Sequence, residues 1–353
     1  MYGWKDNIRR VRPYIPGEQP ELKDMIKLNT NENPYPPAPA VERILRGYDA
    51  EELNRYPDPS ATLLVDAIAR RYDLRREEVF VGVGSDDVLA MSFMTFFHSN
   101  RPLLFPDISY SFYDVWAETF DIPYRKIPLD DNFEIHPEDY ERENGGIIIP
   151  NPNAPTGIDA GQEKLEQIIR ANPNAVVIID EAYVDFGAVS LLPLIDRYDN
   201  LLVVQTFSKS RALAGSRIGF AMGNSELICA LWDVRNSFNS YTMDRITQKL
   251  GAASIEDEDY FQAQLARVIA SREWTKKELR RLGFYFPDSR TNFIFARHER
   301  LPAIEIFHAL KEAGILVRHF ALPKIDNYLR ISIGTDQQMQ DMIRFLDHYL
   351  ADH

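Results

Sequence analysis

Lys209 and Asp180 each stand directly behind an apolar run of the sequence, where a strand of a sheet would end. Asp180 and Tyr183 follow the run at residues 175–179, and Lys209 follows the run at residues 201–205. Open α/β folds bind their ligands at this edge of the sheet. A lysine there is costly to bury unless it is paired, neutralised or covalently bonded, although a lone strand-end lysine can also be solvated.

Groups suited to a phosphate accompany this lysine. Ser208 precedes it and Arg217 follows eight residues later, which supplies a hydroxyl and a guanidinium. Upstream, an expected strand at residues 79–83 runs into a helical pattern that opens with Gly84, Ser85 and Asp86. The free backbone N–H groups at a helix start bind anions, although Ser85 could instead be an ordinary N-cap. The pattern predicts a phosphate site.

Pyridoxal phosphate is the cofactor that these groups suit. The amine of Lys209 would bond its aldehyde, Asp180 would keep its pyridine nitrogen protonated so that the ring accepts electrons, and Tyr183 would bond the ring hydroxyl. A nicotinamide dinucleotide fits less well, because Asp87 takes the place of the third glycine of its fingerprint.

Short apolar runs alternate with helical patterns from about residue 60 to residue 225, as in a parallel sheet with crossover helices. Several runs are apolar on both faces, which is typical of a sheet covered by helices on both sides. The expected strands lie at residues 79–83, 103–105, 146–149, 175–179, 201–205 and 218–222. The pattern predicts an α/β large domain.

Beyond residue 246 the pattern changes to a charged helical tract that reaches about residue 281. Strands are expected after it at 292–296, 315–318 and 328–332, with helices at 303–313 and 337–350. We therefore expect a large cofactor-binding domain at residues 45–255 and a small α/β domain at residues 256–353. The proline-rich residues 1–44 should form an ordered arm that packs with the small domain and a dimer partner.

Composition narrows the possible partners. The 353 residues exceed one ordinary domain, and 45% apolar with 26% charged residues is the balance of a soluble globular protein. A net charge of −13 disfavours nucleic acid and anionic membranes as partners. A charged N-terminus and the lack of a long apolar run predict a cytoplasmic protein. The one cysteine, Cys229, is expected to be a packed thiol, and no metal site is predicted.

Several stretches of the chain carry a family resemblance, in order from one end to the other: LNTNENP at 28–34, RYPD at 55–58, GSDD at 84–87, SY at 109–110, NPNAPTG at 151–157, DEAY at 180–183, SK at 208–209 with Arg217, and YLRISIG at 328–334. With them the chain resembles the fold-type-I, class-II pyridoxal-phosphate-dependent aminotransferases, and most closely the histidinol-phosphate aminotransferase family. The resemblance implies the aspartate-aminotransferase-like α/β fold, with a mostly parallel central sheet.

The resemblance also implies roles for residues whose types alone would not reveal them. Tyr110 would stack on the pyridine ring, although it could equally be one more aromatic of its stretch. Tyr56 would reach the cofactor phosphate of the other subunit, which makes the active unit a homodimer. Arg330 would take the anionic group of the substrate.

For the substrate phosphate the resemblance implies two further residues, Arg318 and Tyr14, and it places Asn31 among the substrate contacts. Arg318 at a strand end could instead be solvated. The chain departs from the family at Ala154, where an asparagine commonly bonds the cofactor's ring hydroxyl. Either Asn153 or Asn151 would supply that bond, or Tyr183 would supply it alone.

The implied activity is transamination of L-histidinol phosphate with 2-oxoglutarate, which are the small-molecule partners, in histidine biosynthesis. Within the same cofactor class, a lyase that resembles threonine-phosphate decarboxylase or an aromatic amino acid aminotransferase remains an alternative. A silent cofactor-binding regulator is a third. Release of carbon dioxide without an oxo acid would identify the lyase.

Overall fold

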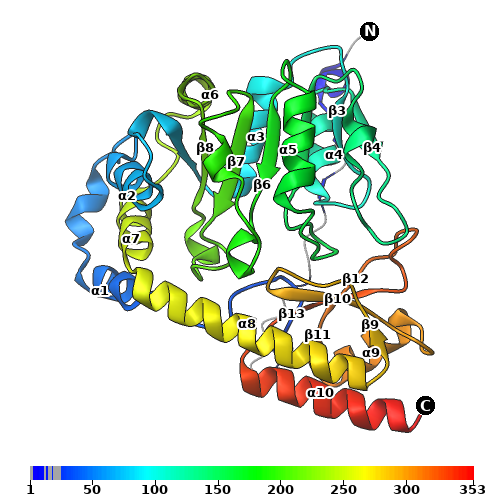
Figure 1. Ribbon diagram of the computed structural model, residues 1–353. Helices are drawn as coiled ribbons and strands as arrows, with labels where there is room; N and C mark the ends of the chain where they lie inside the picture. The colour runs from blue at the N-terminus through cyan, green and yellow to red at the C-terminus, as the bar shows by residue number, and fades with distance from the viewer. Residues whose placement is uncertain (1–2, 12, 15–17, 19–24) are drawn as a thin grey trace.

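A seven-stranded sheet forms the centre of the computed structural model, which describes residues 3–11, 13–14, 18 and 25–353 (Figure 1). The strand order is β2-β8-β7-β6-β5-β3-β4, and β8 alone runs antiparallel to its neighbours. The strands are β2 (Val79–Gly82), β3 (Leu103–Pro106), β4 (Tyr124–Ile127), β5 (Gly146–Pro150), β6 (Val177–Asp180), β7 (Leu201–Thr206) and β8 (Gly219–Gly223).

Both faces of this sheet are buried, because successive side chains of its strands point to opposite sides. Ile147 and Ile149 of β5 belong to one core cluster, whereas Ile148 belongs to another. The first cluster includes side chains of α1 (Pro39–Gly47), α2 (Thr62–Tyr72), α5 (Gln162–Ala171) and α7 (Arg245–Glu256). The second includes side chains of α3 (Ser85–Phe96), α4 (Phe112–Thr119) and α6 (Ser225–Phe238). The continuous apolar runs of the sequence follow from this double cover.

Six of these strands lie within one or two residues of the predicted ranges, and the seventh, β4, was not predicted. β4 is the edge strand of the sheet, and its central residues Arg125 and Lys126 are exposed. Charged side chains are a common protection of an edge, and they remove the apolar run from which the other strands were predicted.

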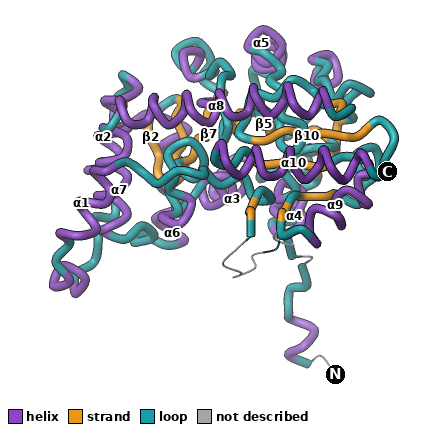
Figure 2. The backbone as a smooth tube through the Cα atoms, turned by 90° about the horizontal axis from the view of Figure 1, so that it is seen from below, coloured by secondary structure: helices purple, strands orange, loops and turns teal. Residues whose placement is uncertain are grey.

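A smaller set of strands packs around a separate hydrophobic core, distinct from the two clusters of the large sheet. The antiparallel sheet β12-β13-β10-β9 contains β9 (Phe284–Tyr285), β10 (Phe293–His298), β12 (Arg318–His319) and β13 (Leu329–Ser332). Beside it, β1 (Ile26–Lys27) pairs in parallel with β11 (Ile315–Leu316). The core also contains side chains of α8 (Glu258–Arg281), α9 (Ala303–Glu312) and α10 (Asp336–Ala351). Helix α8 runs from α7 beneath both sheets and lies beside α10 (Figures 1 and 2).

Short 3-10 turns occupy many of the connections: η1 (Trp4–Asn7), η2 (Ala50–Asn54), η3 (Arg76–Glu78), η4 (Pro137–Tyr140), η5 (Val184–Phe186), η6 (Leu192–Leu194) and η7 (Ala214–Ser216). Figure 2 shows η1 projecting away from the body of the molecule, and Trp4 is 71% exposed. Residues 1–2, 12, 15–17 and 19–24 of the expected arm lie outside the described residues.

The prediction of a packed thiol at Cys229 is wrong. Helix α6 turns Ile228 and Leu231 toward the core, and Cys229 lies on its exposed side. A helix of this kind buries only one stripe of its surface, and the cysteine falls outside that stripe. Within the described ranges, no helix has the length and apolar character that crossing a bilayer requires.

Candidate active site

A cavity of about 560 Å³ opens at the carboxyl edge of the parallel strands and is lined by residues of both sheets. Most of the predicted site residues line it: Tyr14, Asn31, Ser85, Asp86, Tyr110, Asp180, Tyr183, Ser208, Lys209, Arg217, Arg318 and Arg330. Gly84, Asn153 and Tyr56 do not line it. The fold therefore gathers residues that are up to 316 positions apart in the sequence, from Tyr14 to Arg330.

Asp180 ends β6 at the floor of this cavity and is almost fully buried. The Tyr113 hydroxyl donates to its Oδ2 at 2.8 Å, and the backbone N–H of Ala182 donates to its Oδ1 at 3.2 Å. Burial raises the pKa of Asp180 to about 6, although both hydrogen bonds act in the opposite direction. A cationic partner in the cavity would stabilise the charged carboxylate.

Lys209 and Tyr183 line the same cavity. The Lys209 Nζ donates to the carbonyl oxygen of Thr30 at 3.3 Å and lies 5.9 Å from the centre of the Tyr183 ring. Asn31 Nδ2 donates to the Tyr183 hydroxyl oxygen at 2.9 Å. Because that oxygen accepts from Asn31, its own hydrogen is free to donate into the cavity.

The predicted phosphate groups converge at the start of α3. Arg217 Nη1 lies 3.4 Å from the Ser208 hydroxyl, and Arg217 Nη2 contacts Asp86 Oδ2 at 3.1 Å. Ser85 is the first residue of the helix, and Gly84 is its N-cap. Gly84 has a φ of +86°, and a Cβ there would lie 2.4 Å from Arg217 Nη2. Only glycine therefore lets the arginine approach the helix start, where the first N–H groups have no partner within the helix.

Arg330 and Arg318 bring two further positive charges to the cavity. No carboxylate of the described residues lies within ion-pair distance of either guanidinium. Arg330 Nη2 donates to the carbonyl oxygen of Asn29 at 3.1 Å, while its Nε is buried and has no hydrogen-bond partner among the described residues. Desolvation and the nearby Arg318 lower the pKa of Arg330. Two half-buried cations without a carboxylate partner among the described residues favour an anionic ligand.

Aromatic rings line the space between these charges. The Tyr110 hydroxyl donates to Asp86 Oδ1 at 2.8 Å, which fixes its ring above the start of α3. Tyr14 stacks on Phe112 with 4.2 Å between the ring centres. The cavity therefore combines two sets of anion-binding residues with aromatic side chains.

Neither asparagine near Ala154 faces this cavity. Asn153 Nδ2 donates to the Ile108 carbonyl and to Thr156, and Asn151 Nδ2 donates to Asp159. Ala154 itself lines the cavity, as Tyr183 does. Of the groups considered for the ring hydroxyl, the structure brings only Tyr183 into the space.

Tyr56 also lies outside the active-site cavity. It is 78% exposed and stacks on Tyr241 with 4.7 Å between the ring centres.

The lining or supporting residues that were not predicted include Asn29, Thr30, Glu32 and Tyr113. Tyr113 lies in the first turn of α4, at a spacing of three residues after Tyr110, which precedes the helix; the Tyr113 N–H donates to the Tyr110 carbonyl oxygen at 3.2 Å. The sequence offers that pattern but not the contact with Asp180. Thr30 acts through its backbone carbonyl, so its residue type carried no information.

Comparison with known proteins agrees with this geometry. Residues 23–346 match the family model "Aminotransferase class I and II". The chain belongs to this aminotransferase family. It is 52% identical over 347 residues to the histidinol-phosphate aminotransferase of Lactococcus lactis subsp. cremoris (strain MG1363), with 98% of each chain covered.

Solved structures share the fold of this aminotransferase. A putative histidinol-phosphate aminotransferase from Erwinia carotovora atroseptica aligns with a TM-score of 0.85 and 25% identity, over 93% of this chain and 97% of that one. The enzyme from Sinorhizobium meliloti, solved in complex with pyridoxal-5'-phosphate, aligns with a TM-score of 0.83 and 23% identity, over 93% and 91%. The predicted fold type I is confirmed.

Proposed function

We propose that this aminotransferase transfers the amino group of L-histidinol phosphate to 2-oxoglutarate, giving imidazole acetol phosphate and glutamate in histidine biosynthesis. One observation carries the proposal: Arg318 and Arg330, whose guanidiniums have no carboxylate partner in the described part of the chain, line the same cavity as Lys209 and Asp180. A relative that is 52% identical over almost its whole length is named histidinol-phosphate aminotransferase.

Pyridoxal phosphate fits the residues present. Asp180 would face the pyridine nitrogen, Tyr183 the ring hydroxyl and Tyr110 the ring face. Ser85, Ser208 and Arg217 would hold the phosphate at the start of α3, where the Gly84 backbone leaves room. When bound, this cofactor supplies an electron-accepting ring that stabilises negative charge on the substrate carbon.

The protein's own part in the reaction is proton transfer and charge placement. Lys209 Nζ, held 3.3 Å from the Thr30 carbonyl, is the base that would take the proton from the amine-bearing carbon of the substrate. Asp180 would hold a proton on the ring nitrogen, because its buried carboxylate gains a cation to pair with.

Both substrates would use the two arginines. Arg330 can accept the carboxylate of glutamate or the phosphate of histidinol phosphate, since a guanidinium fork suits either oxyanion. Arg318 and Tyr14 would add preference for the dianionic phosphate. Asn31 and Asn29 line the same cavity, and the Asn29 carbonyl oxygen accepts a hydrogen bond from Arg330.

We also propose that the active unit is a homodimer in which Tyr56 reaches the partner's cofactor phosphate. Leu53, Leu63 and Phe238 are also exposed, and they are close in the chain to Tyr56 or to Tyr241, on which it stacks; this supports a covered surface. The proposal includes the division into an arm (1–44), a large domain (45–255) and a small domain (256–353). A single cysteine accords with the reducing cytoplasm as the site of the reaction.

A panel of amino donors with 2-oxoglutarate, followed by glutamate formation and by the absorbance of the cofactor, tests the proposed substrate. L-histidinol phosphate should give the highest kcat/KM of the panel. Carbon dioxide release in the absence of an oxo acid would instead identify a lyase, and a preference for aromatic amino acids would identify a different aminotransferase.

Replacing Arg318 by alanine should weaken the phosphorylated substrate selectively. We expect kcat/KM for histidinol phosphate to fall by about 10- to 100-fold, which corresponds to one charge-assisted hydrogen bond, and that for glutamate to fall only a few-fold. The ratio of the two losses is the measurement. Equal losses would remove Arg318 from phosphate recognition.

A further inference from the structure

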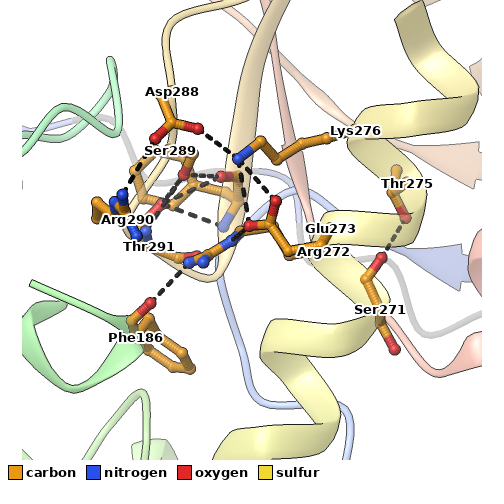
Figure 3. A network of polar contacts seen from close by, with 11 residues as sticks. Phe186, Ser271, Arg272, Glu273, Thr275, Lys276, Asp288, Ser289, Arg290 and Thr291 are labelled. Atoms are coloured by element: carbon orange, nitrogen blue, oxygen red, sulfur yellow. Dashed lines mark hydrogen bonds and ion pairs between the residues drawn. The ribbon is translucent and has the colours of Figure 1, made fainter.

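Arg272 is a cation of helix α8 with only 2% of its surface exposed, and it does not line the active-site cavity. Its Nη1 donates to the carbonyl oxygen of Phe186 at 2.7 Å and to that of Thr291 at 2.9 Å, and its Nε contacts Glu273 at 2.9 Å (Figure 3). A buried guanidinium is costly unless it is hydrogen-bonded. These bonds offset the cost of burial and hold the planar group in one orientation.

Each of the two carbonyls belongs to a segment that leads into the site. Phe186 lies in η5, and its N–H donates to the carbonyl oxygen of Tyr183 at 3.2 Å. Thr291 precedes Asn292, whose Nδ2 donates to the carbonyl oxygen of Asn31 at 2.9 Å.

Asn31 in turn donates to the Tyr183 hydroxyl at 2.9 Å. The contacts thus form a closed ring that passes from Tyr183 through Phe186, Arg272, Thr291 with Asn292, and Asn31 back to Tyr183. Arg272 is the only charged member, and it joins a segment that follows β6 to the segment that enters β10.

We propose that Arg272 is a positioning residue that fixes the Tyr183 hydroxyl for its contact with the cofactor. This inference rests on the proposed function. Without the guanidinium, two buried carbonyls lose their donor and the two segments are free to shift relative to one another. The Tyr183 hydroxyl is the member of this cycle of contacts that faces the cavity, so a shift of the two segments changes its position.

The same helix offers a matched control one turn further on. Lys276 is also buried, with 5% of its side chain exposed, and it pairs with Glu273 and Asp288 (Figure 3). Neither of these partners belongs to the ring. Lys276→Met therefore removes a buried charge of α8 and leaves both Nη1 bonds of Arg272 in place.

The test compares wild type, Arg272→Met, Arg272→Lys and Lys276→Met, all loaded with pyridoxal phosphate. A donor to the hydroxyl oxygen of the cofactor's pyridine ring stabilises the anionic form of that oxygen. The pH midpoint of the cofactor absorbance therefore reports the Tyr183 contact. We expect Arg272→Met to raise this midpoint by about half a unit to one unit and to lower kcat about tenfold, with both KM values within about threefold of wild type. Lys276→Met should lower Tm while its midpoint and kcat stay those of wild type.

An unmoved midpoint in Arg272→Met, or an equal shift in Lys276→Met, overturns the inference. If Arg272→Met does not fold, Arg272→Lys decides. The lysine side chain ends before the Nη1 position, so both bonds should weaken and the midpoint should shift by less in the same direction; no shift overturns the inference. A wild-type protein without cofactor absorbance or transamination would defeat the proposed function instead, so the two failures are distinguishable.

Discussion

The Asp180 carboxylate illustrates how single residues set the chemistry of this site. Two donors, the Tyr113 hydroxyl and the Ala182 N–H, stabilise its charged form, yet burial outweighs them and raises its pKa to about 6. The neighbouring Glu181 is also buried, and desolvation raises its pKa to about 7. Without a cation in the cavity the charged Asp180 is destabilising, which is the condition that favours binding of a protonated ring.

Asp180→Asn should stabilise the cofactor-free protein while it removes activity. A carboxyl whose folded pKa is raised from 3.8 to about 6 takes up a proton on folding, so stability falls as pH rises through that window. At pH 8 the variant should be more stable than wild type by about 1–2 kcal/mol, because relief of the buried charge exceeds the loss of one hydrogen bond, the amide accepting only one of the two donors. At pH 4, where the buried carboxyl is protonated, the two proteins should be equally stable. Urea unfolding of the apo proteins between these pH values measures the difference.

Glu181 remains in both proteins, so its own pH dependence cancels in that comparison. In the loaded enzyme kcat should fall by at least about 100-fold, because the ring nitrogen loses its counter-charge. A variant that is less stable than wild type at every pH would show that the Asp180 contacts outweigh its desolvation.

Tyr113→Phe probes the donor that the sequence did not reveal. Loss of the hydroxyl removes one bond to the Asp180 carboxylate and leaves the ring packed in the core. We expect kcat to fall by about 3- to 10-fold with little change in KM, as for one neutral donor to a charged group. A change confined to KM would argue that Tyr113 serves packing alone.

At the scale of elements, the start of α3 is the structure on which phosphate binding depends. The helix is 12 residues long and begins at Ser85, directly after a glycine whose left-handed φ no other residue adopts readily. Arg217 arrives from the loop before β8, and Gly219 of that strand packs against the backbone of Gly84 and Ser85. Glycines at 84 and 219 therefore let two elements approach at backbone contact distance.

Gly84→Ala should weaken cofactor binding more than its backbone strain alone predicts. Gly161 provides the control, because it also caps a helix, α5, at a φ of +83° and has nothing within 4 Å of an added Cβ. Both variants should lose about 1 kcal/mol of stability. Only Gly84→Ala should raise the Kd for pyridoxal phosphate, by about tenfold or more, in a fluorescence titration of the apo protein. Equal affinities would mean that Arg217 relocates without cost.

The whole molecule raises the question of what covers the exposed surface around Tyr56 and the projecting η1. A homodimer whose partners exchange Tyr56 gives a complementation test: Lys209→Ala and Tyr56→Ala chains are mixed, unfolded together and refolded. Half of the dimers are then mixed, and one of their two sites has both residues intact, so about a quarter of wild-type activity should return. Activity that stays at the sum of the two variants would show that Tyr56 serves its own subunit or none.

The sequence by itself determined the chemistry and the larger sheet, because buried strands have a period and composition of their own and because Lys209, Asp180 and Tyr183 follow directly upon them. It also placed the two arginines, through the family resemblance. It did not predict β4, whose charged edge carries no apolar run, and it misjudged Cys229, whose side of α6 only packing decides. Only the tertiary structure joined Tyr113 to Asp180, excluded Asn153 and Asn151 from the cavity, and brought Arg272 within reach of Phe186 and Thr291. The Tyr113–Asp180, Arg272–Phe186 and Arg272–Thr291 contacts join residues 67, 86 and 19 positions apart, and no local pattern encodes them because their partners meet only when the elements have packed.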